Sequence, residues 1–130
     1  MKKNLKDKKI LLIISGGIAA YKCLDLIRLL KKQHVEIKTV LTKSAKNFVT
    51  PLSVTALSKG KVYQDFFDAE SESGFDHISL SRWADAILVA PATANIVAKF
   101  ANGIADDLAS TLVLASSKNT ILVPAMNVRM

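Results

Sequence analysis

Hydrophobic positions along the chain change their spacing several times, and each change marks a new element. Residues 9–14 (KILLII) form a nearly continuous apolar run, which is typical of a strand that is buried on both faces. Apolar residues then recur at helical spacing from Ile18 to about Lys32, and residues 35–41 (VEIKTVL) return to strand character. This order predicts a β-α-β unit with two parallel strands.

The rest of the chain continues this alternation. Thr50 before Pro51 predicts an N-cap and a first-turn proline, so a helix should run to about Ser58. Residues 61–76 are the least regular and most acidic part, and they predict a short strand or extended piece followed by an exposed loop. The remaining predicted elements are a short helix from His77, a strand over 85–90, helices near 93–101 and 105–116, and a strand over 120–124.

The alternation of strands and helices predicts the α/β fold class. We expect a doubly wound, flavodoxin-like or Rossmann-like open parallel sheet with helices on both faces. A chain of 130 residues, half of them apolar, can bury the core of one domain, which we place at residues 9–130 after a basic tail over residues 1–8.

The formal net charge of +7 would suggest a nucleic-acid partner, but the positions of the charges along the chain do not support one. Five of the lysines lie in residues 1–9, where Asp7 is the one acidic residue, and such a tail is usually solvated. Aromatic residues make up only 6% of the chain, too few for base-stacking platforms. Its apolar runs are far shorter than the roughly 20 residues of a spanning helix. We therefore expect a cytoplasmic protein without nucleic-acid or membrane partners.

The single cysteine, Cys23, excludes an intrachain disulfide and makes a cysteine-based metal site implausible, so we expect no metal. It lies within the apolar pattern of the first predicted helix. This position favours a buried structural residue over a reactive thiol.

Small residues, hydroxyls and two asparagines follow the predicted strands. The segments concerned are SGGIAAYK (15–22), TKSAKN (42–47), PATANI (91–96) and PAMN (124–127). Ligands of open α/β sheets bind outside the carboxyl ends of the strands. The sequence therefore predicts one ligand site built from four separate loops.

The first of these loops lacks both the three-glycine spacing of a dinucleotide fingerprint and the GK[ST] ending of a P-loop. A turn at Gly16 and Gly17 into a helix exposes backbone N–H groups and the positive end of the helix dipole, which suits one phosphate or another anion. Alternatively, the two glycines only permit a tight turn. Thr42 and Ser44 could donate to the same phosphate or simply cap a turn.

Other polar residues have either a structural or a functional interpretation. Thr93 is a plausible N-cap, and Asn95 falls in the first turn of its helix, where side-chain amides are common for structural reasons. Asn127 could be structural for the same reason. Alternatively, Asn95 and Asn127 contact a ligand, because they would lie on neighbouring loops at the sheet edge that ligands favour. His77 is either a surface or interface residue or an acid–base residue, whereas His34, at the opposite edge of the sheet, should be solvated.

The ordered set SGGIAAYK, HISLSRWAD, APATAN and PAMN resembles the flavin-containing cysteine decarboxylases. The resemblance runs from about Lys8 to Met130 and is strongest to the flavoprotein half of the bacterial enzymes of coenzyme A biosynthesis. It implies an FMN enzyme that decarboxylates 4'-phosphopantothenoylcysteine to 4'-phosphopantetheine. It also implies a homotrimer, or a dodecamer built of trimers, with the flavin at a subunit boundary.

The resemblance also implies roles for individual residues. Asn127 matches the asparagine that contacts the substrate carboxylate, and His77 matches the catalytic histidine. The implied cofactor-binding residues are Ser15, Gly16, Gly17, Ile18, Ala19, Thr42 and Ser44 at the phosphate end, with Ala92, Thr93, Ala94, Asn95 and Ala125 along the flavin.

The family pattern continues past PAMN into a substrate-covering flap that carries a cysteine. Bacterial members often add a CTP-dependent ligase domain as well, and we expect neither within these 130 residues. Cys23 cannot replace the flap cysteine because it belongs to the first helix. Two alternatives to a complete decarboxylase stay open: a flavin prenyltransferase, which shares the fold and the FMN site, and a catalytically incomplete FMN-binding or regulatory subunit.

Overall fold

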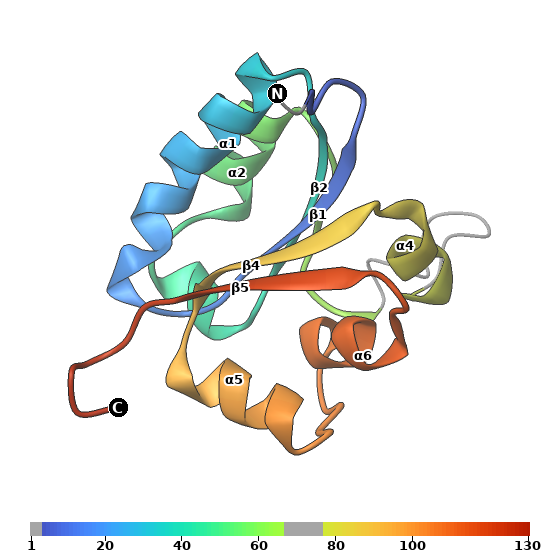
Figure 1. Ribbon diagram of the computed structural model, residues 1–130. Coiled ribbons are helices and arrows are strands. Elements are labelled where there is room, and N and C mark those ends of the chain that lie inside the picture. Colours follow the sequence, from blue (N-terminus) through green and yellow to red (C-terminus); the bar gives the residue numbers. More distant parts are fainter. Residues whose placement is uncertain (1–3, 67–76) are drawn as a thin grey trace.

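The computed structural model describes residues 4–66 and 77–130, which form a parallel sheet between two layers of helices (Figure 1). The predicted order of helices and strands is confirmed, except that the first helix begins as a 3-10 turn and the strand predicted over 85–90 runs on to Ala92. The exposed loop predicted within residues 61–76 falls largely on residues 67–76, which lie outside the described ranges. The elements are β1 (Lys9–Ile14), the 3-10 helix η1 (Ile18–Tyr21), α1 (Lys22–Lys32), β2 (Glu36–Leu41), the 3-10 helix η2 (Ser44–Asn47), α2 (Pro51–Ser58), β3 (Val62–Tyr63), α4 (His77–Trp83), β4 (Ala86–Ala92), α5 (Ala94–Ala101), α6 (Leu108–Ala115) and β5 (Asn119–Pro124).

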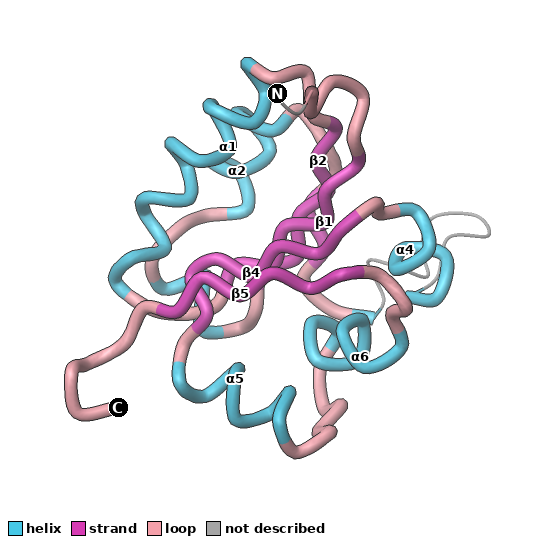
Figure 2. Tube along the Cα trace, viewed as in Figure 1, coloured by secondary structure: helices cyan, strands magenta, loops and turns pink. Residues whose placement is uncertain are grey.

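The strands are ordered β3-β2-β1-β4-β5, and every pairing between them is parallel (Figure 2). From β1 the chain adds β2 and β3 on one side and then β4 and β5 on the other. The connections therefore diverge between β1 and β4, which leaves a crevice at the carboxyl ends of these two strands.

Both faces of the sheet are covered, which explains the continuous apolar run of β1. Leu11 and Ile13 pack in a core with residues of α4, α5 and α6. Leu12 and Ile14 pack in a second core with residues of α1 and α2. The two helix layers are visible on either side of the strands in Figure 1, and the predicted doubly wound α/β fold is confirmed.

Side-chain caps fix where three helices begin. Thr50 Oγ1 accepts a hydrogen bond from the Ser53 amide at 3.0 Å and starts α2, as predicted. Thr93 caps α5 in the predicted way. Asp107 caps α6 through a capping box with Ser110, which the sequence analysis did not predict.

Thr39 in β2 offers a test of the packing. It is fully buried, and within the described part of the chain its Oγ1 has no hydrogen-bond partner. A buried hydroxyl without a partner keeps its desolvation cost, so Thr39→Val should raise the free energy of unfolding by about 1 kcal/mol. Urea denaturation measures this change. Ser110→Ala is the matched control, because it removes a buried hydroxyl that is hydrogen-bonded and should lower stability. A loss of stability in Thr39→Val would contradict the prediction.

Candidate functional site

A cavity of about 1100 Å³ lies where the predicted loops converge, at the carboxyl ends of the strands. This volume is slightly above the roughly 300–1,000 Å³ that is typical of small-molecule sites. The predicted residues that line it are Ser15, Gly16, Gly17, Ile18, Ala19, Thr42, Ser44, Thr93, Ala94, Asn95, Ala125 and Asn127. The four loops thus form one site, although their binding roles stay predictions.

The turn after β1 approaches η2 so closely that only glycine fits at position 16. A Cβ atom on Gly16 would lie 2.2 Å from Ser44 Cβ and 2.6 Å from the Ser44 carbonyl carbon. A Cβ on Gly17 would meet only Thr93 Cγ2, at 3.4 Å. Gly17 is the N-cap residue of η1, and no side chain caps this end of the helix. The amide groups of this turn therefore remain available to a ligand in the cavity.

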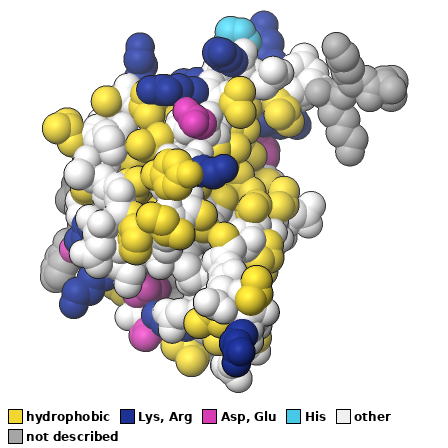
Figure 3. Space-filling model, turned by 90° about the vertical axis from the view of Figure 1, so that its left-hand side faces the viewer, with side chains coloured by type: hydrophobic (Ala, Val, Ile, Leu, Met, Phe, Trp, Pro, Cys, Tyr) yellow, Lys and Arg dark blue, Asp and Glu magenta, His cyan; other side chains and the backbone are white. Residues whose placement is uncertain are grey.

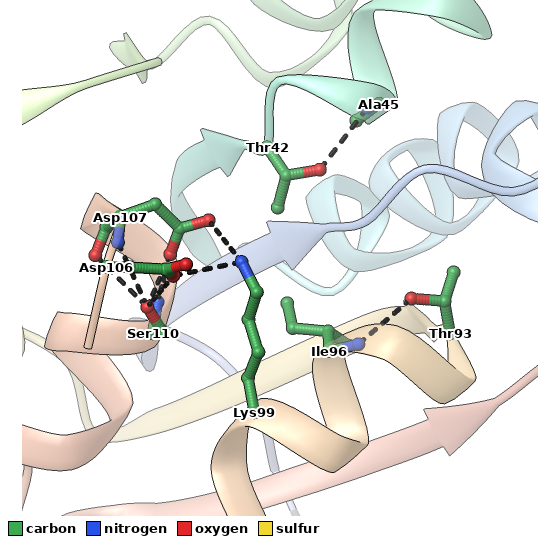
Figure 4. Close-up of polar contacts among 8 residues, drawn as sticks. All are labelled: Thr42, Ala45, Thr93, Ile96, Lys99, Asp106, Asp107 and Ser110. Carbon is green, nitrogen blue, oxygen red and sulfur yellow. Dashed lines mark hydrogen bonds and ion pairs between the residues drawn. The ribbon is translucent and has the colours of Figure 1, made fainter. Parts of the chain in front are cut away.

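The loop after β2 forms the opposite wall of this corner. Thr42 donates its amide to Ile14 O at 3.1 Å, which ties the loop to the end of β1. Its Oγ1 accepts from the Ala45 amide at 3.2 Å (Figure 4), so the capping interpretation holds for this side chain. A hydroxyl that accepts in this way can still donate its proton to an anion. Ser44 is exposed beside it.

Ser15 and Ala92 hold the strand ends together. Ser15 is only 2% exposed; its hydroxyl donates to Pro91 O and accepts from the Thr93 amide at 3.2 Å. Ala92 is fully buried and is not part of the cavity wall, and its carbonyl accepts from the Ala125 amide at 3.1 Å. The resemblance implies that both residues contact the cofactor, whereas their contacts here position Thr93 and Ala125.

The start of α5 forms the wall between the glycine turn and β5. Thr93 Oγ1 accepts from the Ile96 amide at 3.3 Å (Figure 4). Asn95, in the first helical turn, is exposed at the cavity. The amino end of α5, whose dipole favours negative charge, therefore lies at the cavity.

The segment after β5 completes the cavity. Ala125, Met126 and Asn127 line it. Asn127 Oδ1 accepts from the Arg129 amide at 3.0 Å. This bond occupies the side-chain oxygen and leaves the amide NH₂ group to donate to a ligand.

An ion-paired cluster on the cavity wall was missed by the sequence analysis. Lys99 Nζ, on α5, lies 2.9 Å from Asp106 Oδ1 and 3.7 Å from Asp107 Oδ2, at the start of α6 (Figure 4). The hydrogen bond with Asp106 raises the pKa of Lys99 and lowers the pKa of Asp106, so the pair is fully ionised near neutral pH. The adjacent aspartates before an apolar stretch could have predicted the helix cap, but no local pattern indicates Lys99 as their partner.

His77 lies outside the cavity lining. It begins α4, and its ring packs edge-on against Phe66 with 6.1 Å between the ring centroids. α4 leads into the amino end of β4, whereas the cavity lies at the carboxyl ends of the strands. Within one chain, His77 and Asn127 are therefore not brought together.

Cys23 is a structural residue, as predicted. It is buried in α1, and its thiol donates to Ala90 O at 2.8 Å. Burial raises the pKa of this thiol to about 11, so it stays protonated near neutral pH. Across residues 4–66 and 77–130, no group of three or more His, Cys, Asp or Glu side chains could hold a metal ion. No helix in these ranges is both long and apolar enough to cross a membrane.

Comparisons with known proteins show what the chain is similar to. A family model described as Flavoprotein matches residues 1–130. The coenzyme A biosynthesis bifunctional protein CoaBC of Vibrio vulnificus (strain YJ016) is 50% identical over 127 residues, which cover 98% of this chain and 32% of that protein. This chain thus spans about a third of the length of the curated relatives it matches.

Two solved structures share both the fold and part of the sequence. The FMN-dependent cysteine decarboxylase SpaF superimposes with a TM-score of 0.89 at 33% identity, over 96% of this chain and 72% of that chain. A mutant PPC decarboxylase complexed with pantothenoylaminoethenethiol superimposes with a TM-score of 0.81 at 33% identity, over 95% of this chain and 69% of that chain.

Proposed function

Because the chain belongs to the flavoprotein family, which its match over residues 1–130 shows, we propose that the cavity binds FMN. The single observation that carries this proposal is the corner at Gly16. There an added Cβ atom would collide with Ser44, so glycine lets the turn pack directly against η2, and the uncapped amides that follow it lie at the cavity. Such a corner suits one phosphate group rather than a dinucleotide.

The residues of the cavity fit the parts of this cofactor. The turn at Gly16 to Ala19 and the hydroxyl of Thr42 would hold the phosphate. Asn95 and the segment from Ala125 would lie along the flavin ring. Ser15 and Ala92 would position these residues through their hydrogen bonds to the ends of the neighbouring strands.

We further propose that the complete enzyme decarboxylates 4'-phosphopantothenoylcysteine, as the names of the CoaBC and PPC decarboxylase relatives suggest. These relatives favour this reaction over the flavin prenyltransferase alternative. Loss of CO₂ from a cysteinyl carboxylate leaves an electron pair without a sink. When bound, FMN supplies the oxidation of the thiol-bearing carbon that creates a C=S sink beta to the carboxylate.

Within that reaction, Asn127 would bind the substrate carboxylate through its free NH₂ group. His77 would act in the oxidation and decarboxylation steps. Since His77 lies outside the cavity of its own chain, we propose that it serves the cavity of a neighbouring copy in a trimer. A dodecamer of such trimers and a cytoplasmic location stay predictions from the sequence.

Exposed apolar side chains support self-association. The sequence predicts the contact around residues 75–83, of which residues 75 and 76 lie outside the described ranges. In the described part, Ile78 on α4 is exposed, as are Ile18 and Leu52 on the side that carries α1. Figure 3 shows hydrophobic side chains exposed on that side among lysines and arginines. Apolar surface of this kind often marks an interface.

The FMN proposal is tested by identifying the flavin that the purified protein binds. Protein purified after incubation with a mixture of FMN and FAD should be yellow, and mass measurement of the extracted cofactor should give FMN. The glycine turn offers space for one phosphate, and the second strand ends in Leu41 without an acidic residue to hold an adenine ribose. Recovery of FAD, or of no flavin from folded protein, would contradict the proposal.

A further inference from the structure

Among the described residues, the charged side chains on the cavity wall belong to two lysines and two aspartates. They are Lys43, in the loop after β2, and the cluster of Lys99, Asp106 and Asp107. The formal charges of these four residues cancel. The cavity proposed for a phosphate-bearing ligand is therefore electrically neutral only because both lysines are present.

The cluster is arranged so that one lysine offsets two carboxylates. Lys99 Nζ contacts Asp106 Oδ1 at 2.9 Å and Asp107 Oδ2 at 3.7 Å. The side chain of Lys99 is only 22% exposed, whereas that of Asp106 is 59% exposed. Solvent therefore screens the charge of Lys99 less than the charge of Asp106. Without Lys99, the two adjacent negative charges of the aspartates would remain on the cavity wall without a compensating charge.

We propose that Lys99 determines specificity for phosphorylated flavin: by balancing Asp106 and Asp107, it lets the cavity accept FMN, and its contribution is small for uncharged riboflavin. This inference rests on the proposed FMN site and concerns a residue to which the family resemblance gave no role. The effect is electrostatic and acts across the cavity, so it requires no direct contact between Lys99 and the phosphate.

A purely structural role for Lys99 makes a different prediction. Lys99 also links α5 to the amino end of α6. If that link mattered only for shape, its loss would weaken FMN and riboflavin binding equally. Asp106→Asn alone would then also weaken binding, because it removes the closer of the two contacts. Charge balance instead predicts that Asp106→Asn leaves FMN binding unchanged or tighter.

The test is a set of fluorescence-quenching titrations with FMN and with riboflavin. Lys99→Met should weaken FMN binding about tenfold at low salt and riboflavin binding less than about twofold, and the FMN effect should shrink at high salt. Lys99→Arg, which keeps the charge, should bind FMN nearly as well as the unchanged protein. Asp106→Asn added to Lys99→Met should restore most of the lost affinity, and it avoids Asp107, which caps α6.

Equal losses for the two flavins in Lys99→Met, or no recovery on adding Asp106→Asn, would overturn the inference while leaving the FMN proposal intact. Failure of the unchanged protein to bind FMN would instead overturn the proposed function.

Discussion

Gly16→Ala should abolish FMN binding, whereas Gly17→Ala should retain it. The new Cβ atom at position 16 would lie 2.2 Å from Ser44 Cβ and 2.6 Å from the Ser44 carbonyl carbon, so η2 must move away from the turn. Overpacking of this kind typically costs about 1–3 kcal/mol and would distort the corner proposed for the phosphate. We expect at least a roughly 100-fold loss of FMN affinity, which corresponds to about 2.7 kcal/mol.

Gly17→Ala is the matched control, because its Cβ atom would meet only Thr93 Cγ2, at 3.4 Å. Titration of both variants with FMN, followed by flavin fluorescence, measures the difference. Circular dichroism of each variant establishes whether the fold persists. A folded Gly16→Ala protein that binds FMN as tightly as the Gly17→Ala protein would show that the phosphate does not occupy this corner.

Asn127→Asp should eliminate decarboxylation while leaving FMN bound. The assay uses a fusion in which residues 1–130 replace the corresponding region of the Vibrio vulnificus CoaBC protein, which is 50% identical. The substitution places a carboxylate where the proposed mechanism needs an NH₂ donor for the substrate carboxylate, and two like charges repel. We expect turnover to fall by at least about 100-fold, since a lost charge-assisted contact and a new repulsion act together.

Asn47→Asp is the control for this substitution, because Asn47 lies in η2 but not on the cavity wall. It should leave CO₂ release unchanged. His77→Asn in the same fusion should also remove turnover and keep FMN. Mixed assemblies of the His77→Asn and Asn127→Asp subunits should recover part of the activity, because some cavities then receive both intact residues. Turnover by Asn127→Asp within twofold of the unchanged fusion would remove Asn127 from substrate binding.

Sequence reasoning predicted the elements whose signals are local. The apolar run of β1 reflects burial between two helix layers, and Thr50 and Thr93 start their helices by accepting from amides three residues later. The cavity wall was also predictable, because the loops that follow parallel strands meet at one edge of the sheet.

The remaining features depend on contacts that no local pattern contains. Ser15 bonds to Pro91 and Thr93 across two adjacent strands, so its structural role appears only once β1 and β4 are paired. Lys99 reaches Asp106 across the turn between α5 and α6. The position of His77 follows from the packing of α4, and its distance from the cavity could not be predicted from a motif.

The location of FMN in a crystal structure of the complex tests the central claim most directly. Its phosphate should lie within hydrogen-bond distance of the amides between Gly17 and Ala19 and of the Thr42 hydroxyl, with the ring directed toward Asn95 and Ala125. A flavin bound outside this cavity, or one with its phosphate away from the glycine turn, would contradict the proposed site.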